Sequence, residues 1–252
     1  MKVNKDSKTF TVPFNVRSYE VDSNEQCTLS SVCNYFQETA GIHAHHLNFD
    51  ISQLKENGQT WVLYKMHVKV THFPKRWQDV EVVTWPSSGD GIRAFRDYEL
   101  LDKDKNRLAF ANSQWMVLDI KTKRPVRMPQ EILTLGQNTP DHVIEPKKSP
   151  IPALKDQPLE RITTVGNHDL DMNNHVNNVI YVDWMTGFIS DEITQLKRCT
   201  ELEIQYVSEA VKGDQIFQRY HVETDYDQLI IRHTLFKGSQ SDVIATGITC
   251  WI

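Results

Sequence analysis

Apolar and polar residues alternate between residues 61 and 70. The apolar positions are Val62, Tyr64, Met66, Val68 and Val70, and Lys65, His67 and Lys69 lie between them. A period of two is typical of a β-strand whose sheet buries one face. Further strands are predicted near residues 9–22, 79–85, 95–102 and 107–119. The polar hexapeptide "DKDKNR" separates the last two and predicts a hairpin turn.

The period changes to that of a helix between residues 29 and 47. The apolar positions that recur on one helical face are Leu29, Val32, Cys33, Phe36 and Ala40. Either Thr28 or Ser30 could cap the beginning of this helix. The first half of the chain therefore reads as a short strand, a loop, a helix and then antiparallel strands.

The second half repeats this order. A short strand and loop are predicted at 162–171 and a helix at 176–189, and strands follow at 200–210, 215–224, 229–238 and 242–252. Such a repeat indicates an internal duplication. One helix on an antiparallel sheet, present twice, predicts an α+β fold of two similar units.

A proline-rich stretch separates the two halves. Five of the ten prolines lie in it, at positions 140, 146, 150, 152 and 158. Proline lacks a backbone donor and disfavours both helices and central strands. The prediction is an N-terminal domain at 1–137, a linker at 138–158 and a C-terminal domain at 159–252.

Composition narrows the class of protein. The chain has 252 residues, 39% of them hydrophobic, and a net charge of −5. It can bury a core, and it lacks the basic excess of most nucleic-acid binders. No apolar run approaches the roughly 20 residues of a membrane span, and the N-terminus does not resemble a secretory signal. Four cysteines without a CxxC pair favour reduced thiols and a cytoplasmic location.

The candidate chemistry lies in the polar stretch "DLDMNNHVNN", residues 169–178, which precedes the second predicted helix. Three of its residues match the first half at an offset of 149 (171 − 22, for example): Asp22 with Asp171, Asn24 with Asn173, and Gln26 with His175. Asp and Asn build turns and helix caps, which accounts for the loop in both halves. Only the second copy has a histidine, which titrates near neutral pH. We therefore expect the chemistry in the second copy.

Four stretches carry a resemblance to a known family. They are "SYEVDSNEQCTLSSVCNYFQETAGIH", "WVLYKMHVKVTHFPKRWQDVEVVTW", "DLDMNNHVNNVIYVDWM" and "LEIQYVSEAVKGD". Together they resemble the acyl-acyl carrier protein (acyl-ACP) thioesterases of plant plastids and bacteria, in the same order and spacing, from about residue 10 to the C-terminus. The resemblance implies a tandem hotdog fold, in which each curved antiparallel sheet wraps one long helix. It also implies that the first hotdog shapes the fatty-acyl pocket.

The resemblance assigns candidate catalytic residues. Asp171, Asn173 and His175 lie on the family's Asp-x-Asn-x-His motif, and Glu209 lies on the glutamate of its next motif. Plant members have a cysteine after that glutamate, once proposed as the nucleophile, whereas this chain has Ala210. Taken alone, Glu209 reads as a solvent-facing residue after a strand. Its counterpart in the first half is near Phe73, so only the second half has an acidic residue at this place. This difference is consistent with a single active site.

These residue types fit thioester hydrolysis. Glu209 is the candidate general base for water, or a direct nucleophile. His175 could share in activating water or return a proton to sulfur, and Asn173 could orient water or the carbonyl group. Asp171 is expected to orient its neighbours. The start of the following helix offers backbone N–H groups for an oxyanion.

Other readings stay open. An acyl-CoA thioesterase, a hotdog dehydratase and a non-catalytic acyl-binding module are the rivals. The histidines of "HAHH", residues 43–46, lack a complete set of metal ligands, so we expect neither a metal nor a cofactor. The expected partner is acyl carrier protein, a small acidic protein, and the protein could be a monomer or a homodimer. Three basic clusters could attract this partner: Lys75 and Arg76; Arg93 and Arg96; and Lys121, Lys123, Arg124 and Arg127.

Overall fold

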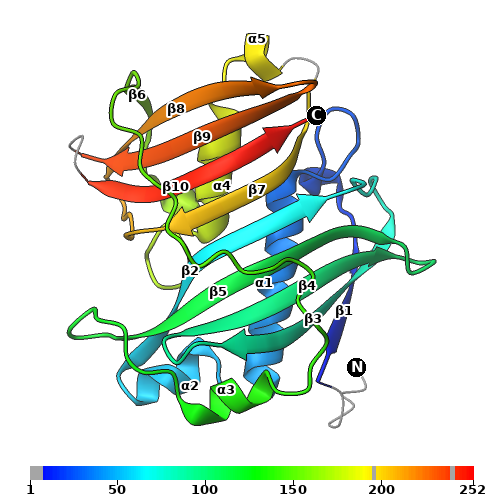
Figure 1. Ribbon diagram of the computed structural model, residues 1–252, viewed down its shortest axis with the longest axis vertical. Helices are drawn as coiled ribbons and strands as arrows, with labels where there is room; N and C mark the ends of the chain where they lie inside the picture. The colour runs from blue at the N-terminus through cyan, green and yellow to red at the C-terminus, as the bar shows by residue number, and fades with distance from the viewer. Residues whose placement is uncertain (1–7, 195–196, 239–241) are drawn as a thin grey trace. The chain divides into compact units, whose positions relative to one another are not determined.

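The computed structural model describes residues 8–194, 197–238 and 242–252 (Figure 1). The chain forms two compact units, with Lys147 closing the first and Lys148 opening the second. This division lies inside the proline-rich stretch 138–158. No helix among the described residues is both long and apolar enough to cross a lipid bilayer.

The first unit is an antiparallel sheet with one long helix on one of its faces. Its strands are β1 (Phe10–Asn15), β2 (Gln59–Val70), β3 (Asp79–Gly89), β4 (Arg93–Asp102) and β5 (Arg107–Asp119). They lie in the order β1-β3-β4-β5-β2. The helix α1 (Leu29–His46) begins after Thr28, whose side chain accepts a hydrogen bond from the Ser31 amide. This confirms the helix and one of its two predicted caps.

The apolar stripe of α1 packs on the sheet as its spacing predicts. Val32, Cys33 and Phe36 are buried, and the Phe36 ring lies 5.1 Å from the ring of Tyr98 on β4. Because side chains alternate along a strand, Asp97 lies on the opposite face of β4 from Tyr98. One face of the sheet therefore holds the helix, and the opposite face carries other groups.

The proline-rich stretch is attached to that opposite face as far as Lys147. Both carboxylate oxygens of Asp97 are engaged, one by the Val143 amide at 3.0 Å and the other by His142 Nδ1 at 2.8 Å. The Lys65 ammonium and the Gln114 side-chain amide both donate to the carbonyl oxygen of Lys147. This part of the predicted linker is therefore packed against the first unit.

That packing corrects one expectation about β2. The alternation predicted that one face of this strand would carry exposed polar residues. Lys65 and His67 are instead only 2% and 8% exposed. The period of two shows which residues share a face, but it does not show what covers that face.

Two short helices in the first unit were not predicted. They are α2 (Ile51–Glu56) and α3 (Gln130–Leu135). Leu54 of α2 and Ile132 of α3 are buried in a small cluster with Val117 and Met128. Each helix has six residues, too few for a periodic pattern to distinguish it from a loop.

The second unit repeats the architecture of the first. Its strands are β6 (Glu160–Thr164), β7 (Cys199–Tyr206), β8 (Gln215–Asp225), β9 (Gln228–Lys237) and β10 (Val243–Trp251). They lie in the order β7-β10-β9-β8-β6, and α4 (Asn178–Gly187) covers one face (Figure 1). A short helix, α5 (Asp191–Thr194), follows α4.

Helix α4 and its sheet approach each other closely at a glycine. A Cβ atom built at Gly247 of β10 would lie 2.6 Å from the Met185 sulfur, so a larger residue there would require the Met185 side chain to move. Met185, Val182 and Trp184 of α4 are buried. The helix begins two residues later than predicted, at Asn178, because Asn177 is its N-cap. This places the helix start immediately after the polar stretch.

Candidate active site

The polar stretch folds into a loop that the first unit repeats bond for bond. Asp171 Oδ1 accepts hydrogen bonds from the amides of Asn173 and His175, at 2.7 and 3.2 Å. Asp22 Oδ1 does the same for Asn24 and Gln26, at 2.8 and 3.1 Å. The two loops also share a residue with positive φ, Asn174 at 61° and Glu25 at 58°. The duplication predicted from sequence is therefore confirmed in the backbone.

The loop is tied to the segment that carries Glu209. The Val176 amide, next to His175, donates to the carbonyl oxygen of Ala210 at 2.9 Å. In the first unit the Cys27 amide donates to the carbonyl oxygen of Pro74 at 2.8 Å. Since Ala210 and Pro74 occupy the same place, their predecessors Glu209 and Phe73 do too, which confirms the predicted pairing.

This tie brings the imidazole and the carboxylate together. His175 Nε2 lies 3.3 Å from Glu209 Oε2. The two side chains are 36% and 47% exposed, so both are open to a ligand or to water. The Glu209 carbonyl oxygen accepts a hydrogen bond from the Lys237 ammonium at 2.6 Å, which joins the segment to β9.

Asp171 and Asn173 hold the loop around this pair. The Asn173 side-chain amide lies 3.4 Å from Asp171 Oδ2, while Asp171 Oδ1 holds the two backbone amides. The carboxylate of Asp171 is thus occupied with fixing the peptide that presents His175. The orienting role expected for Asp171 stays a prediction.

The beginning of α4 lies beside the same loop. The side chain of Asn177 accepts from the Val179 amide at 3.0 Å, and its carbonyl oxygen accepts from the Ile180 amide at 2.9 Å. Two of the amides at the N-terminal end of the helix are therefore engaged by the cap. The positive end of the helix dipole still points toward the loop.

A buried tyrosine lies behind the pair. Tyr181 of α4 is 3% exposed, and its hydroxyl oxygen accepts a hydrogen bond from the Ala210 amide at 3.0 Å. Burial raises the pKa of Tyr181 to about 12, and the negative charges of Glu209, Asp214 and Asp171 add to the rise. The phenol stays protonated at neutral pH. Tyr181 is not among the residues predicted from sequence, because its position on the apolar face of α4 is typical of a core residue.

The first unit has the same loop without the reactive groups. Gln26 replaces the histidine and Phe73 replaces the glutamate. The adjacent Glu25 forms an ion pair with Arg76, which stacks at 4.2 Å on the Trp77 ring. An imidazole beside a carboxylate is thus present in the second loop and replaced in the first.

The other candidate groups have separate structural roles. Arg96 donates to the buried His43, Arg93 pairs with Asp90, and Asp50 binds His45. Burial, together with the nearby charge of Arg96, lowers the pKa of His43 to about 3. The described residues contain no group of three or more His, Cys, Asp or Glu placed to hold a metal ion.

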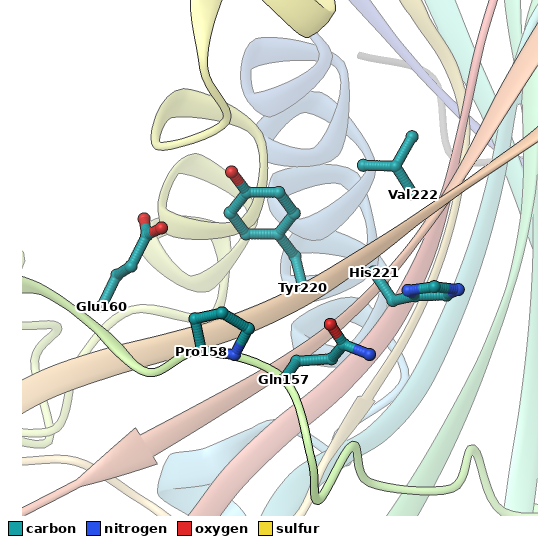
Figure 2. Close-up of a pocket in the computed structure, with 6 residues that line it drawn as sticks. All are labelled: Gln157, Pro158, Glu160, Tyr220, His221 and Val222. Carbon is teal, nitrogen blue, oxygen red and sulfur yellow. The ribbon is translucent and has the colours of Figure 1, made fainter.

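Figure 2 shows a pocket in the second unit. It lies between the segment that leads into β6 and strand β8. Its lining residues are Gln157, Pro158, Glu160, Tyr220, His221 and Val222. None of the predicted site residues contributes to it.

The arrangement can activate a water molecule. A carboxylate and an imidazole in contact, both accessible, form an acid–base pair that can remove a proton and deliver one. The loop and helix start supply polar groups beside the pair.

The chain is similar to known proteins over most of its length. Residues 7–135 match the acyl-ACP thioesterase N-terminal domain, and residues 153–252 match the acyl-ACP thioesterase C-terminal domain. A chloroplast palmitoyl-ACP thioesterase of Cuphea hookeriana is 29% identical over 80% of this chain and 52% of its own length. A chloroplast oleoyl-ACP thioesterase of Arabidopsis thaliana is 27% identical over 83% of this chain and 63% of its own. The chain thus spans about half to two thirds of the length of these curated relatives.

Solved structures give the same result for the fold. An acyl-ACP thioesterase from Bacteroides thetaiotaomicron superimposes with a TM-score of 0.86 and 25% identity, over 97% of this chain and 98% of that one. The 12:0-ACP thioesterase from Umbellularia californica gives a TM-score of 0.83 and 23% identity, over 98% of each chain. These matches confirm the predicted tandem of hotdog units. The chain belongs to the acyl-ACP thioesterase family.

Proposed function

We propose that this protein hydrolyses the thioester of a fatty acyl chain carried by acyl carrier protein, and so releases a free fatty acid. The observation that carries the proposal is the contact between His175 Nε2 and Glu209 Oε2, 3.3 Å apart and accessible. Family membership supplies the substrate class. The duplicated loop without these two groups supports a single active site.

In the proposed mechanism Glu209 removes a proton from water, and the resulting hydroxide attacks the thioester carbonyl carbon. The carbon–sulfur bond then breaks, and the thiolate leaves with the electron pair. His175, in contact with Glu209, carries the proton toward sulfur, which yields a thiol and a carboxylic acid. General acid–base groups of this kind contribute about 10²- to 10⁴-fold in rate.

Asp171 and Asn173 position the reacting groups in this proposal. Asp171 holds the backbone that presents His175, and Asn173 turns its amide toward the loop. Developing negative charge on the carbonyl oxygen is stabilised by the side-chain amide of Asn173 and by the positive end of α4. Ala210, which follows Glu209, has no thiol, so the mechanism does not pass through a cysteine at that position.

The test is thiol release by the purified protein from three thioesters of one acyl chain, carried by acyl carrier protein, by coenzyme A and by N-acetylcysteamine. The proposal predicts the highest kcat/KM for the carrier-protein thioester. A preference for the coenzyme A thioester would instead make the protein an acyl-CoA thioesterase.

Two further outcomes would overturn hydrolysis itself. Formation of an enoyl product from a 3-hydroxyacyl thioester, without thiol release, would indicate a dehydratase. Binding of acyl chains with no turnover at high protein concentration would indicate an acyl-binding module.

A further inference from the structure

We propose that Tyr181 is a positioning residue for Glu209, acting through the backbone amide of Ala210. The inference rests on the proposed function, because it assigns to Tyr181 the task of holding the general base. Tyr181 does not touch the reacting atoms. Its contact is with the residue that follows the base.

Ala210 is held from both sides. Its carbonyl oxygen accepts from the Val176 amide at 2.9 Å, and its own amide donates to the Tyr181 hydroxyl oxygen at 3.0 Å. Ala210 is fully buried. The first bond ties Glu209 to the loop of His175, and the second ties it to α4. Two bonds to different elements restrict both translation and rotation of this peptide.

The tyrosine is itself fixed by packing. Its ring lies 5.2 Å from the ring of Trp184 and 5.5 Å from that of Tyr206. The Tyr206 hydroxyl in turn donates to the Asn178 carbonyl oxygen, in the first turn of α4, at 3.0 Å. The phenol therefore holds Ala210 from a rigid position, as a supporting residue must.

The first unit forms the corresponding turn without a bond of this kind. At the place of Ala210 it has Pro74, which has no amide hydrogen, and at the place of Tyr181 it has Val32, which is fully buried (181 − 149 = 32). The Pro74 carbonyl oxygen still accepts from the Cys27 amide at 2.8 Å. The chain can thus build this turn with a proline and a valine. The copy that carries His175 and Glu209 instead has a hydrogen bond between the Ala210 amide and the Tyr181 hydroxyl.

The difference matters because the Glu209 side chain is 47% exposed. With half of the side chain in solvent, packing alone does not fix the carboxylate, and its position follows that of the backbone. An error of about 1 Å in the placement of a reacting group can cost about 10²-fold in rate. The second hydrogen bond of Ala210, to Tyr181, is therefore expected to raise kcat.

The first experiment compares the wild type with Tyr181→Phe, which removes one hydroxyl group. The matched control is Thr234→Val, since the Thr234 hydroxyl also accepts from a backbone amide, that of Leu154, at 2.9 Å in the same unit. Both variants are expected to unfold at a lower Tm. We expect only Tyr181→Phe to lower kcat, by about 10- to 100-fold, with KM for the acyl-ACP thioester unchanged.

The second experiment completes a double-mutant cycle with Ala210→Pro, which removes the donor and copies Pro74. Tyr181→Phe is expected to lower kcat in the Ala210 background and to have no further effect in the Ala210→Pro background. An equal fall in both backgrounds would mean that the hydroxyl acts elsewhere. Ala210→Pro also breaks the bond by itself, so an unchanged kcat in either folded single variant would overturn the inference.

The wild type separates this failure from failure of the proposed function. If the wild type releases no thiol, the proposed function is wrong. If the wild type is active and Tyr181→Phe behaves like Thr234→Val, the function stands and the positioning role of Tyr181 is wrong.

Discussion

At the scale of single residues, the two copies of the loop separate structure from chemistry. Asp22 and Asp171 each accept two backbone amides through Oδ1 at nearly equal distances. Only Asp171 lies beside an imidazole paired with a carboxylate. Asp22 therefore serves as an internal control that shows what the structural role of Asp171 alone would be.

Replacement of either aspartate by alanine removes the same bonds. We expect Asp22→Ala and Asp171→Ala to lower the free energy of unfolding by a similar amount, about 1–3 kcal/mol. Only Asp171→Ala is expected to lower kcat, by about 10²-fold, because His175 loses its fixed position. Urea unfolding and thiol release measure the two effects. Equal activity in the two variants would show that Asp171 is merely structural.

Another residue-scale prediction concerns a buried histidine in the second unit. His233 is 1% exposed between Gln218 and Thr249, and burial lowers its pKa to about 3. The unfolded chain takes up this proton near pH 6.5, whereas the folded chain does not until about pH 3. The contribution of His233 to stability is therefore complete above about pH 6.5 and is lost as the pH falls toward 3.

The variant His233→Gln removes this titration. Between pH 6 and pH 4.5 the unfolding free energy of the wild type should fall more steeply than that of the variant, by about 1.4 kcal/mol per pH unit. His43 remains in both proteins and contributes equally. Parallel pH dependences in urea unfolding would contradict the assignment.

At the scale of elements, the part of the proline-rich stretch that ends at Lys147 is attached to the first unit. Asp97, which is fully buried, binds the Val143 amide, the His142 imidazole and the Asn112 side chain. A carboxylate with this many partners holds the stretch on the face of β4 that lies opposite the helix.

We expect Asp97→Ala to lower the unfolding free energy by about 2–4 kcal/mol, because buried polar partners are left unsatisfied. Trypsin should then cut faster after Lys147 and Lys148 in the native protein. Asp104→Ala, in the exposed turn between β4 and β5, serves as the control. Unchanged cleavage in Asp97→Ala would show that other contacts hold the stretch.

At the scale of the whole molecule, net charge bears on the choice of partner. The chain carries −5, so an acidic carrier protein is not attracted by the total charge. Of the three predicted basic clusters, Arg76 and Arg93 are engaged in ion pairs, and Arg96 contacts His43. The cluster after β5, residues 121–127, is exposed at Lys121, Lys123, Arg124 and Arg127. This cluster is the best remaining candidate for steering.

The double variant Arg124→Gln/Arg127→Gln tests that role. We expect KM for acyl-ACP to rise about 3- to 10-fold at low salt, and the difference to vanish at high salt, because exposed charges are screened. KM for the uncharged N-acetylcysteamine thioester should not change. The control Arg107→Gln/Arg232→Gln alters the net charge equally at residues paired with Glu99 and Glu223. An equal rise in the control would exclude a specific role for the cluster.

The sequence predicted the repeated architecture because the helical period, the strand period and the loop residues all recur in the second half. The offset of Asp22, Asn24 and Gln26 from their counterparts located the second loop, and the structure placed His175 against Glu209. The catalytic roles of these residues stay predictions. The burial of Lys65 and His67 could not be foreseen, because it depends on a distant segment that covers β2. Tyr181 was missed because it lies on the apolar face of α4, where the sequence does not show that its hydroxyl group binds a backbone amide.

The most direct test of the account is the rate of thiol release from acyl-ACP by the wild type and by Glu209→Gln, with circular dichroism as evidence of folding. Glutamine keeps the size of the side chain and removes the base. The account predicts rapid release by the wild type and a loss of about 10²- to 10⁴-fold in the folded variant. Release at the wild-type rate by folded Glu209→Gln would contradict the claim that the pair of His175 and Glu209 performs the hydrolysis.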